Sequence, residues 1–214
     1  MSSQHCTNLR RGLVLAAALS LAACASGPSR APASAGSGAQ GVDGAERVVP
    51  PQAQTLYEQA ASSMAAGDLI DAELRFKEFL LQYPEFPGAH VNLSIIHSEN
   101  GNLDAARAAV DAALGIDPEY APALNQSGVL LRKNGNFSEA EAAYLKAVTV
   151  APDYPLAHYN LGVLNELYLQ RLDAALRHFE RYKELVGEDE QVSRWIVDLQ
   201  RRVAASQRTA NMTE

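Results

Sequence analysis

An internal repeat of 34 residues is the feature that most constrains how this chain can fold. Prolines, glycines and alanines recur at that interval, at Pro84, Pro118 and Pro152, at Gly67, Gly101 and Gly135, and at Ala72, Ala106 and Ala140. A fourth copy near Leu169 comes one residue late and lacks the glycine and the final proline. A unit of this length cannot cover its own apolar face, so neighbouring units must stack. The period therefore predicts an array of similar units.

Each unit is expected to contain two helices joined by a glycine turn. In the third copy, the pattern predicts a first helix over 121–134 and a second from 137 or 138 to about 150. Gly135 can take the left-handed conformation that ends a helix, and Pro152 stops the second helix. A small residue recurs in the first helices, where it is expected to face the repeated alanine, at Ala60, Ser94, Gly128 and Gly162. These features predict an all-α fold.

The pattern resembles the tetratricopeptide repeat. In the third copy nearly every hallmark residue type is present, namely Leu124, Gly128, Leu131, Gly135, Ala140, Tyr144, Ala147 and Pro152. The resemblance covers about residues 53–187 and implies an α-solenoid of about four helix-turn-helix repeats. It also implies a protein that binds other proteins in a concave groove lined by the first helix of each repeat.

A further helix is expected after the repeats, over residues 188–206. Its apolar residues follow a helical spacing, at Val192, Ile196, Leu199 and Val203. We predict that this helix caps the array with Trp195 as its anchor. The alternatives are that it binds a partner or forms a dimer interface. Residues 207–214 are expected to be a disordered tail.

The first 23 residues have the layout of a secretory signal peptide. Arg10 and Arg11 precede an apolar run from Gly12 to Ala23, which is too short to span a membrane as a helix. The run ends in Leu21-Ala22-Ala23-Cys24, which resembles the lipobox of bacterial lipoproteins. That resemblance implies lipidation of Cys24, with palmitate among the acyl groups, and Ala25 after it implies sorting to the outer membrane. The alternative is a chance cysteine after an ordinary signal peptide.

Residues 24–52 are expected to form a flexible linker. The segment is rich in glycine, serine, alanine and proline, and it has no apolar periodicity. It would hold the repeats away from the membrane surface, on the periplasmic side.

The sequence offers little for catalysis, metal ions or nucleic acid. The formal net charge of −7 argues against nucleic-acid binding. The histidines form no close metal-ligand pair, and His90 and His158 occupy equivalent repeat positions, which packing explains better than metal binding. No nucleotide-binding or hydrolase motif occurs. We therefore predict no enzyme activity, no cofactor and no metal.

The groove implied by the resemblance is the candidate binding site. Repeat alignment places the following candidate residues there: Tyr57, Asn92, Ile95, Asn125, Val129, Arg132, Lys133, Tyr159, Asn160 and Val163. We predict that the three asparagines hold a peptide backbone, because an amide both donates and accepts hydrogen bonds. Arg132 and Lys133 suggest a partner with an acidic residue. The alternative is that the asparagines serve turns and solvated helix faces.

Lipobox, linker and repeats together are similar to the pilotin-like lipoproteins that assist pilus and secretion assembly. The expected function is a periplasm-facing scaffold or assembly factor on the outer membrane that binds other envelope proteins. The alternative is an adaptor for cell-wall enzymes or for an envelope energy-transducing complex. The identity of the partner, and whether the groove takes an extended peptide or a helix, stay open.

Overall fold

The computed structural model describes residues 49–211, and these contain nine α-helices and no strand. In chain order they are α1 (Pro51–Ala65), α2 (Leu69–Gln82), α3 (Pro87–Glu99), α4 (Leu103–Ile116), α5 (Ala121–Lys133), α6 (Phe137–Val150), α7 (Pro155–Leu167), α8 (Leu172–Val186) and α9 (Glu190–Asn211). The predicted all-α class is confirmed. The predicted signal peptide and Cys24 lie outside the described residues.

Left-handed residues form the turns between the two helices of each repeat. Gly67, Gly101 and Gly135 have φ of 82°, 78° and 83°, a conformation that costs a glycine little. In the fourth repeat Gln170 takes this position with φ of 54°. The one-residue shift of the fourth copy therefore keeps the turn geometry but fills it with a residue that has a Cβ atom.

Two helix boundaries differ from the sequence expectation. Helix α1 begins at Pro51, inside the segment 24–52 that was expected to be linker. Proline suits this place, because its missing N–H would have no partner in the first turn anyway. Helix α9 continues to Asn211, so residues 207–211 are helical and not part of a disordered tail. Residues 212–214 lie outside the described part of the chain.

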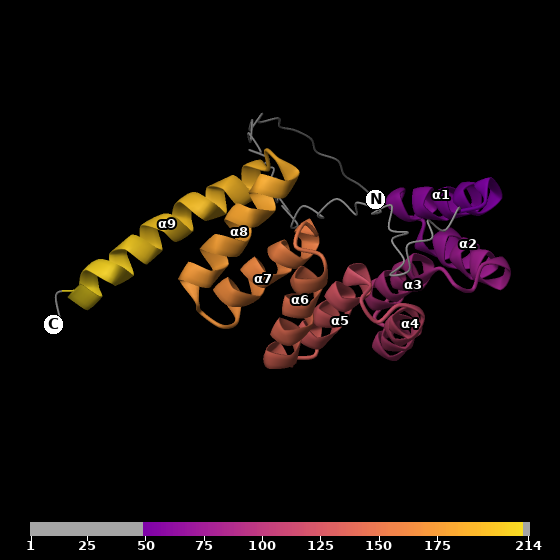
Figure 1. Cartoon of the computed structure of the whole chain (residues 1–214), viewed down its shortest axis with the longest axis horizontal. Coiled ribbons are helices and arrows are strands. Elements are labelled where there is room, and N and C mark those ends of the chain that lie inside the picture. The colour runs from indigo at the N-terminus through magenta and orange to yellow at the C-terminus, as the bar shows by residue number, and fades with distance from the viewer. Residues whose placement is uncertain (1–48, 212–214) are drawn as a thin grey trace, which may run out of the picture. The chain divides into compact units, whose positions relative to one another are not determined.

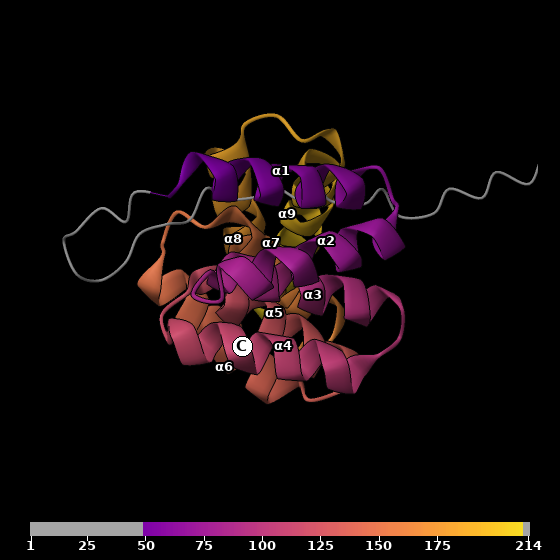
Figure 2. The same ribbon diagram turned by 90° about the vertical axis from the view of Figure 1, so that its right-hand side faces the viewer.

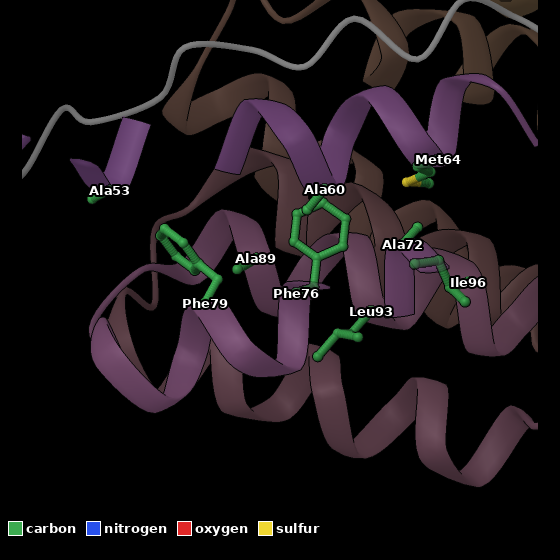
Figure 3. Close-up of a cluster of buried hydrophobic side chains, with 9 residues drawn as sticks. All are labelled: Ala53, Ala60, Met64, Ala72, Phe76, Phe79, Ala89, Leu93 and Ile96. Atoms are coloured by element: carbon green, nitrogen blue, oxygen red, sulfur yellow. The ribbon is translucent and has the colours of Figure 1, made fainter. Parts of the chain in front are cut away.

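Close approach of the two helices in each repeat depends on the small residue in the first helix. In the first repeat Phe76 of α2 points toward Ala60 of α1, and both are fully buried (Figure 3). In the third repeat the ring of Tyr144 lies directly against Gly128, where a Cβ atom would be only 2.5 Å from a ring carbon. The small residue was expected to face the repeated alanine, but at Gly128 and Gly162 the nearest atoms belong to a buried aromatic ring of the second helix.

The repeats follow one another in chain order from α1 to α8, and α9 packs on α8 (Figures 1 and 2). The first helices also contact each other, α3 with α5 and α5 with α7, whereas no comparable contact joins α4 to α6 or α6 to α8 within residues 49–211. A stack whose members approach more closely on one side curves toward that side. The first helices therefore line the inner curve of the repeats.

Helix α9 closes the last repeat, as predicted for a capping helix. Its residues Val192 and Leu199 are buried against α8. Trp195 lies with its ring centroid 5.5 Å from that of Phe179 and 6.1 Å from that of Tyr159. Within residues 49–211, no helix combines the length and the apolar character needed to cross a membrane.

Candidate protein-binding face

We call the side lined by α1, α3, α5 and α7 the inner face. All ten residues predicted for the groove lie on these four helices. Their exposure differs, however. Lys133 is exposed and Asn125 and Asn160 are buried, while seven are half-buried: Tyr57, Asn92, Ile95, Val129, Arg132, Tyr159 and Val163.

The asparagines join neighbouring repeats. Asn92 Nδ2 donates to the Tyr57 hydroxyl over 2.8 Å, and Asn160 Nδ2 donates to Asn125 Oδ1 over 2.9 Å. In both pairs the partners are 35 residues apart, so each bond runs from one first helix to the next. Because Asn125 is only 6% exposed and Asn160 only 9%, this pair serves the packing of α5 on α7 more than it serves a ligand. The predicted contact of asparagines with a peptide backbone stays a prediction, with Asn92 the most accessible member.

Arg132 and Lys133, the two residues predicted to form a cationic spot, differ in their exposure to solvent. Arg132 Nε donates to the Tyr144 hydroxyl over 3.4 Å, and its guanidinium carbon lies 5.8 Å from the ring centroid of Tyr168. Lys133 Nζ donates to Ser98 Oγ over 2.6 Å and stays exposed. Arg132 is thus held between Tyr144 of its own repeat and Tyr168 of the next repeat. Lys133 is the charge that an acidic partner could reach.

The two tyrosines of the inner face are neutral hydrogen-bonding groups at physiological pH. Burial raises the pKa of Tyr57 above its ordinary value, and the hydrogen bond from Asn92 offsets part of that rise. Burial, followed by the nearby charge of Asp189, also raises the pKa of Tyr159. Both rings pack on aromatic side chains behind them, Tyr57 on Phe76 and Tyr159 on Tyr182. Their orientation is therefore set by the core.

Sequence reasoning missed one further polar link and one close approach of a glycine to two hydroxyls on the inner face. Gln126 Nε2 donates to Ser94 Oγ over 3.3 Å, and this bond also joins neighbouring first helices. A Cβ atom at Gly88 would lie 3.1 Å from the hydroxyl oxygens of both Tyr57 and Tyr120, so this glycine leaves room for two hydroxyls. Searching the sequence for polar residues about one repeat apart, instead of at equal repeat positions, would have found the polar link.

The histidines serve the packing of the repeats. His158 Nε2 lies 3.0 Å from the carbonyl oxygen of Pro152, and the equivalent His90 hydrogen-bonds to the backbone of Pro84. His158 Nδ1 also lies 3.2 Å from His178 Nδ1. Between residues 49 and 208, no three His, Cys, Asp or Glu side chains gather closely enough to hold a metal ion.

Comparison with known families agrees with this geometry. A family model described as "Tetratricopeptide repeat" matches residues 63–127, and a second, described as "TPR repeat", matches residues 128–167. Residues 63–167 are thus built of tetratricopeptide repeats. Such repeats typically form non-catalytic scaffolds for protein–protein interaction. No curated protein matches the sequence.

Solved structures show the same repeat architecture. PilF of Pseudomonas aeruginosa is similar with a TM-score of 0.63 at 21% identity, over 72% of this chain and 69% of that one. TTC0263 of Thermus thermophilus is similar with a TM-score of 0.61 at 23% identity, over 71% of this chain and 82% of that one. The first repeat domain of Spaghetti (RPAP3), bound to the HSP90 peptide SRMEEVD, has a TM-score of 0.51 at 19% identity, over 55% and 95%. At these identities the likeness concerns the fold alone.

Proposed function

We propose that this tetratricopeptide-repeat protein is a lipid-anchored scaffold on the periplasmic face of the outer membrane. In this role it binds a segment of another envelope protein on its inner face, and Cys24 carries the lipid. The repeat fold supports the binding role, and the lipobox-like Leu21-Ala22-Ala23-Cys24 supports the anchor.

A row of aliphatic side chains along the inner face is the observation that carries the binding role. Ala61, Ile95, Val129 and Val163 occupy the same place in the four first helices, each 34 residues from the next, and all four are half-buried. A partner segment lying along the row would remove this remaining apolar surface from water, which is favourable by about 25 cal/mol per Å². Lys133 and Asn92 at its side offer polar contacts.

The hydrogen bonds between the first helices preorganise this row of aliphatic side chains. Because the links Asn92–Tyr57, Gln126–Ser94 and Asn160–Asn125 connect successive repeats, the four aliphatic side chains keep their spacing before a partner arrives. A preorganised surface loses less conformational freedom on binding than a flexible one does.

Pilus or secretion assembly is our candidate pathway, because lipobox, linker and repeats together are similar to pilotin-like lipoproteins. An adaptor for cell-wall enzymes or for an envelope energy-transducing complex would use the same anchor and inner face. The Spaghetti domain bound to the HSP90 peptide SRMEEVD is an example of this fold holding a peptide with acidic residues. By the same chemistry, an acidic residue of the partner would pair with Lys133.

Photo-crosslinking in cells tests the binding role. A photoreactive amino acid would replace Val129 or Lys133 on the inner face, and the matched control would replace Ala142, which is exposed on α6 of the same repeat. We expect one envelope protein to crosslink from both inner-face positions and not from Ala142, and mass spectrometry of the adduct would name the pathway. Adducts from Ala142 alone would contradict the inner face as the binding surface.

A charge reversal tests the acidic contact. Lys133→Glu should weaken the crosslink at Val129, whereas Lys146→Glu on α6, also an exposed lysine of the third repeat, should leave it unchanged. An equal crosslink in both variants would remove Lys133 from the proposal.

A further inference from the structure

Helix α2 carries apolar side chains on two opposite faces. One face packs toward α1 and contributes Ala72, Phe76 and Phe79 to the core of the first repeat (Figure 3). On the opposite face three large aliphatic residues are exposed to solvent, Ile70 by 83%, Leu74 by 56% and Leu81 by 85%. We call Ile70, Leu74 and Leu81 the α2 strip.

The other repeats show that the fold does not require this strip. At the equivalent places in the second helices stand Asp104, Ala108 and Gly115 in the second repeat, Ser138, Ala142 and Thr149 in the third, and Asp173, Arg177 and Glu184 in the fourth. These residues are small, polar or charged, as is usual on a solvated helix face. The strip is therefore specific to the first repeat and has no part in stacking.

The spacing of the strip suits a partner helix. Residues 70, 74, 77 and 81 are separated by four, three and four positions, which is the spacing of residues along the contact line of a coiled coil. The third of these positions is Lys77, whose Nζ donates to Glu73 Oε1 over 2.6 Å. Its ammonium is thus directed to the side, and its methylene groups extend the apolar line between Leu74 and Leu81.

Acidic residues flank the strip on both sides. Glu73 directly precedes Leu74 and Glu78 directly follows Lys77, and these are the two kinds of position that border a coiled-coil contact line. The charge is also unequal over the array. Residues 49–120 hold eleven acidic and three basic side chains, a net charge of −8, whereas residues 121–211 hold eleven of each and are neutral. The surroundings of the strip thus favour a cationic partner.

We propose that the α2 strip is a docking surface for a basic amphipathic helix of a partner protein. Apolar residues of that helix would cover Ile70, Leu74 and Leu81. Its flanking lysines or arginines would pair with Glu78 on one side and share Glu73 with Lys77 on the other. A second copy of α2 fits poorly, because it would bring its own acidic flanks against these. An anionic membrane surface is disfavoured by the same charge. This surface is separate from the inner face, so neither proposal depends on the other.

A pair of designed peptides tests the proposal with the full chain. Both are three-heptad helices with leucine along the contact line, and the flanking positions carry lysine in one and glutamate in the other. Fluorescence anisotropy of the labelled peptides gives their affinities. We expect the lysine peptide to bind roughly tenfold or more tightly than the glutamate peptide, and the difference to shrink as salt is added.

Variants copied from the third repeat serve as tests that preserve the fold. The triple variant Ile70→Ser, Leu74→Ala, Leu81→Thr installs the residues of Ser138, Ala142 and Thr149, and it should keep the helical circular-dichroism spectrum while losing at least roughly tenfold in affinity. Glu78→Lys installs the residue found at Lys146, and it should bring the affinities for the two peptides closer together.

Three results would overturn the proposal. The first is equal binding of the lysine peptide by the wild-type chain and the triple variant. The second is a wild-type chain that dimerises in light scattering and becomes monomeric in the triple variant, which would assign the strip to a second copy. The third is binding to phosphatidylethanolamine–phosphatidylglycerol vesicles that the triple variant loses, which would assign the strip to a membrane.

Discussion

Single residues decide how closely the two helices of a repeat can approach. Gly128 and Gly162 lie against the buried rings of Tyr144 and Phe179, and a Cβ atom at either glycine would come within 2.5 to 2.9 Å of three ring carbons. In a helix, alanine is otherwise favoured over glycine by up to about 1 kcal/mol. At these positions the steric cost and the helix preference therefore oppose each other.

We predict that the steric cost is larger at Gly128. Gly128→Ala should lower the free energy of unfolding by about 1 to 3 kcal/mol, because the fully buried Tyr144 ring has little room to move. The control is Gly115→Ala in α4, where nothing lies within 4 Å of the added Cβ atom, and this variant should gain up to about 1 kcal/mol. Urea unfolding of both variants measures the two effects. A stabilised Gly128→Ala variant would contradict the packing argument.

The pair of histidines between α7 and α8 can hold its hydrogen bonds only in certain protonation states. Because the Pro152 carbonyl accepts from His158 Nε2–H, the neutral His158 ring has a bare Nδ1 that accepts from His178 Nδ1–H. Burial first, then His158 and Arg177, lower the pKa of His178 to about 4. Its ordinary value is 6.5.

This pKa predicts a loss of stability in mild acid. A histidine whose pKa is lower in the folded state contributes stability above pH 6.5, and that contribution is lost as the pH falls toward 4. Between pH 7 and pH 5 the protein should lose on the order of 1 kcal/mol through this group. His178→Gln keeps a polar side chain but removes the titration, so its urea midpoint should change less between the two pH values. An unchanged pH dependence in this variant would show that other groups are responsible.

At the scale of helices, the 34-residue period was sufficient to predict most of the fold. The period predicted the positions of the turn glycines and of the small residues in the first helices, because equivalent positions of each repeat have the same backbone conformation. The hydrogen bonds Asn92–Tyr57 and Asn160–Asn125 were not predictable in this way. Each of these bonds joins residues that are 35 positions apart, one more than the period. The two partners therefore occupy different positions in their repeats, and a comparison of equivalent positions does not pair them. The α2 strip was also not predicted, because its residues occur in the first repeat only and the prediction used residues that all repeats share.

The contribution of helix α9 to the stability of the last repeat can be tested by mutation. Leu199 is fully buried against α8, whereas Val197 on the same helix is 55% exposed. Leu199→Ala should lower the free energy of unfolding by about 2 to 5 kcal/mol through lost burial and a cavity. The control Val197→Ala should change it by less than about 0.5 kcal/mol. Thermal unfolding distinguishes the two. A similar small effect for both would mean that α9 does not stabilise the last repeat.

For the whole molecule, the proposed scaffold requires that the repeats be held at a membrane by Cys24. Each acyl CH₂ group buried in the bilayer contributes about 0.8 kcal/mol, so several chains anchor a protein firmly. We predict that an alkyne analogue of palmitate labels the wild-type protein and that the protein fractionates with outer membranes. Cys24→Ser should abolish both, because serine offers no thiol for a thioether. Cys6→Ser is the matched control and should keep both, since Cys6 lies within the predicted signal peptide. Persistent labelling of Cys24→Ser, or loss of labelling in Cys6→Ser, would contradict the proposed anchor. The location of the scaffold at a membrane would then have no support.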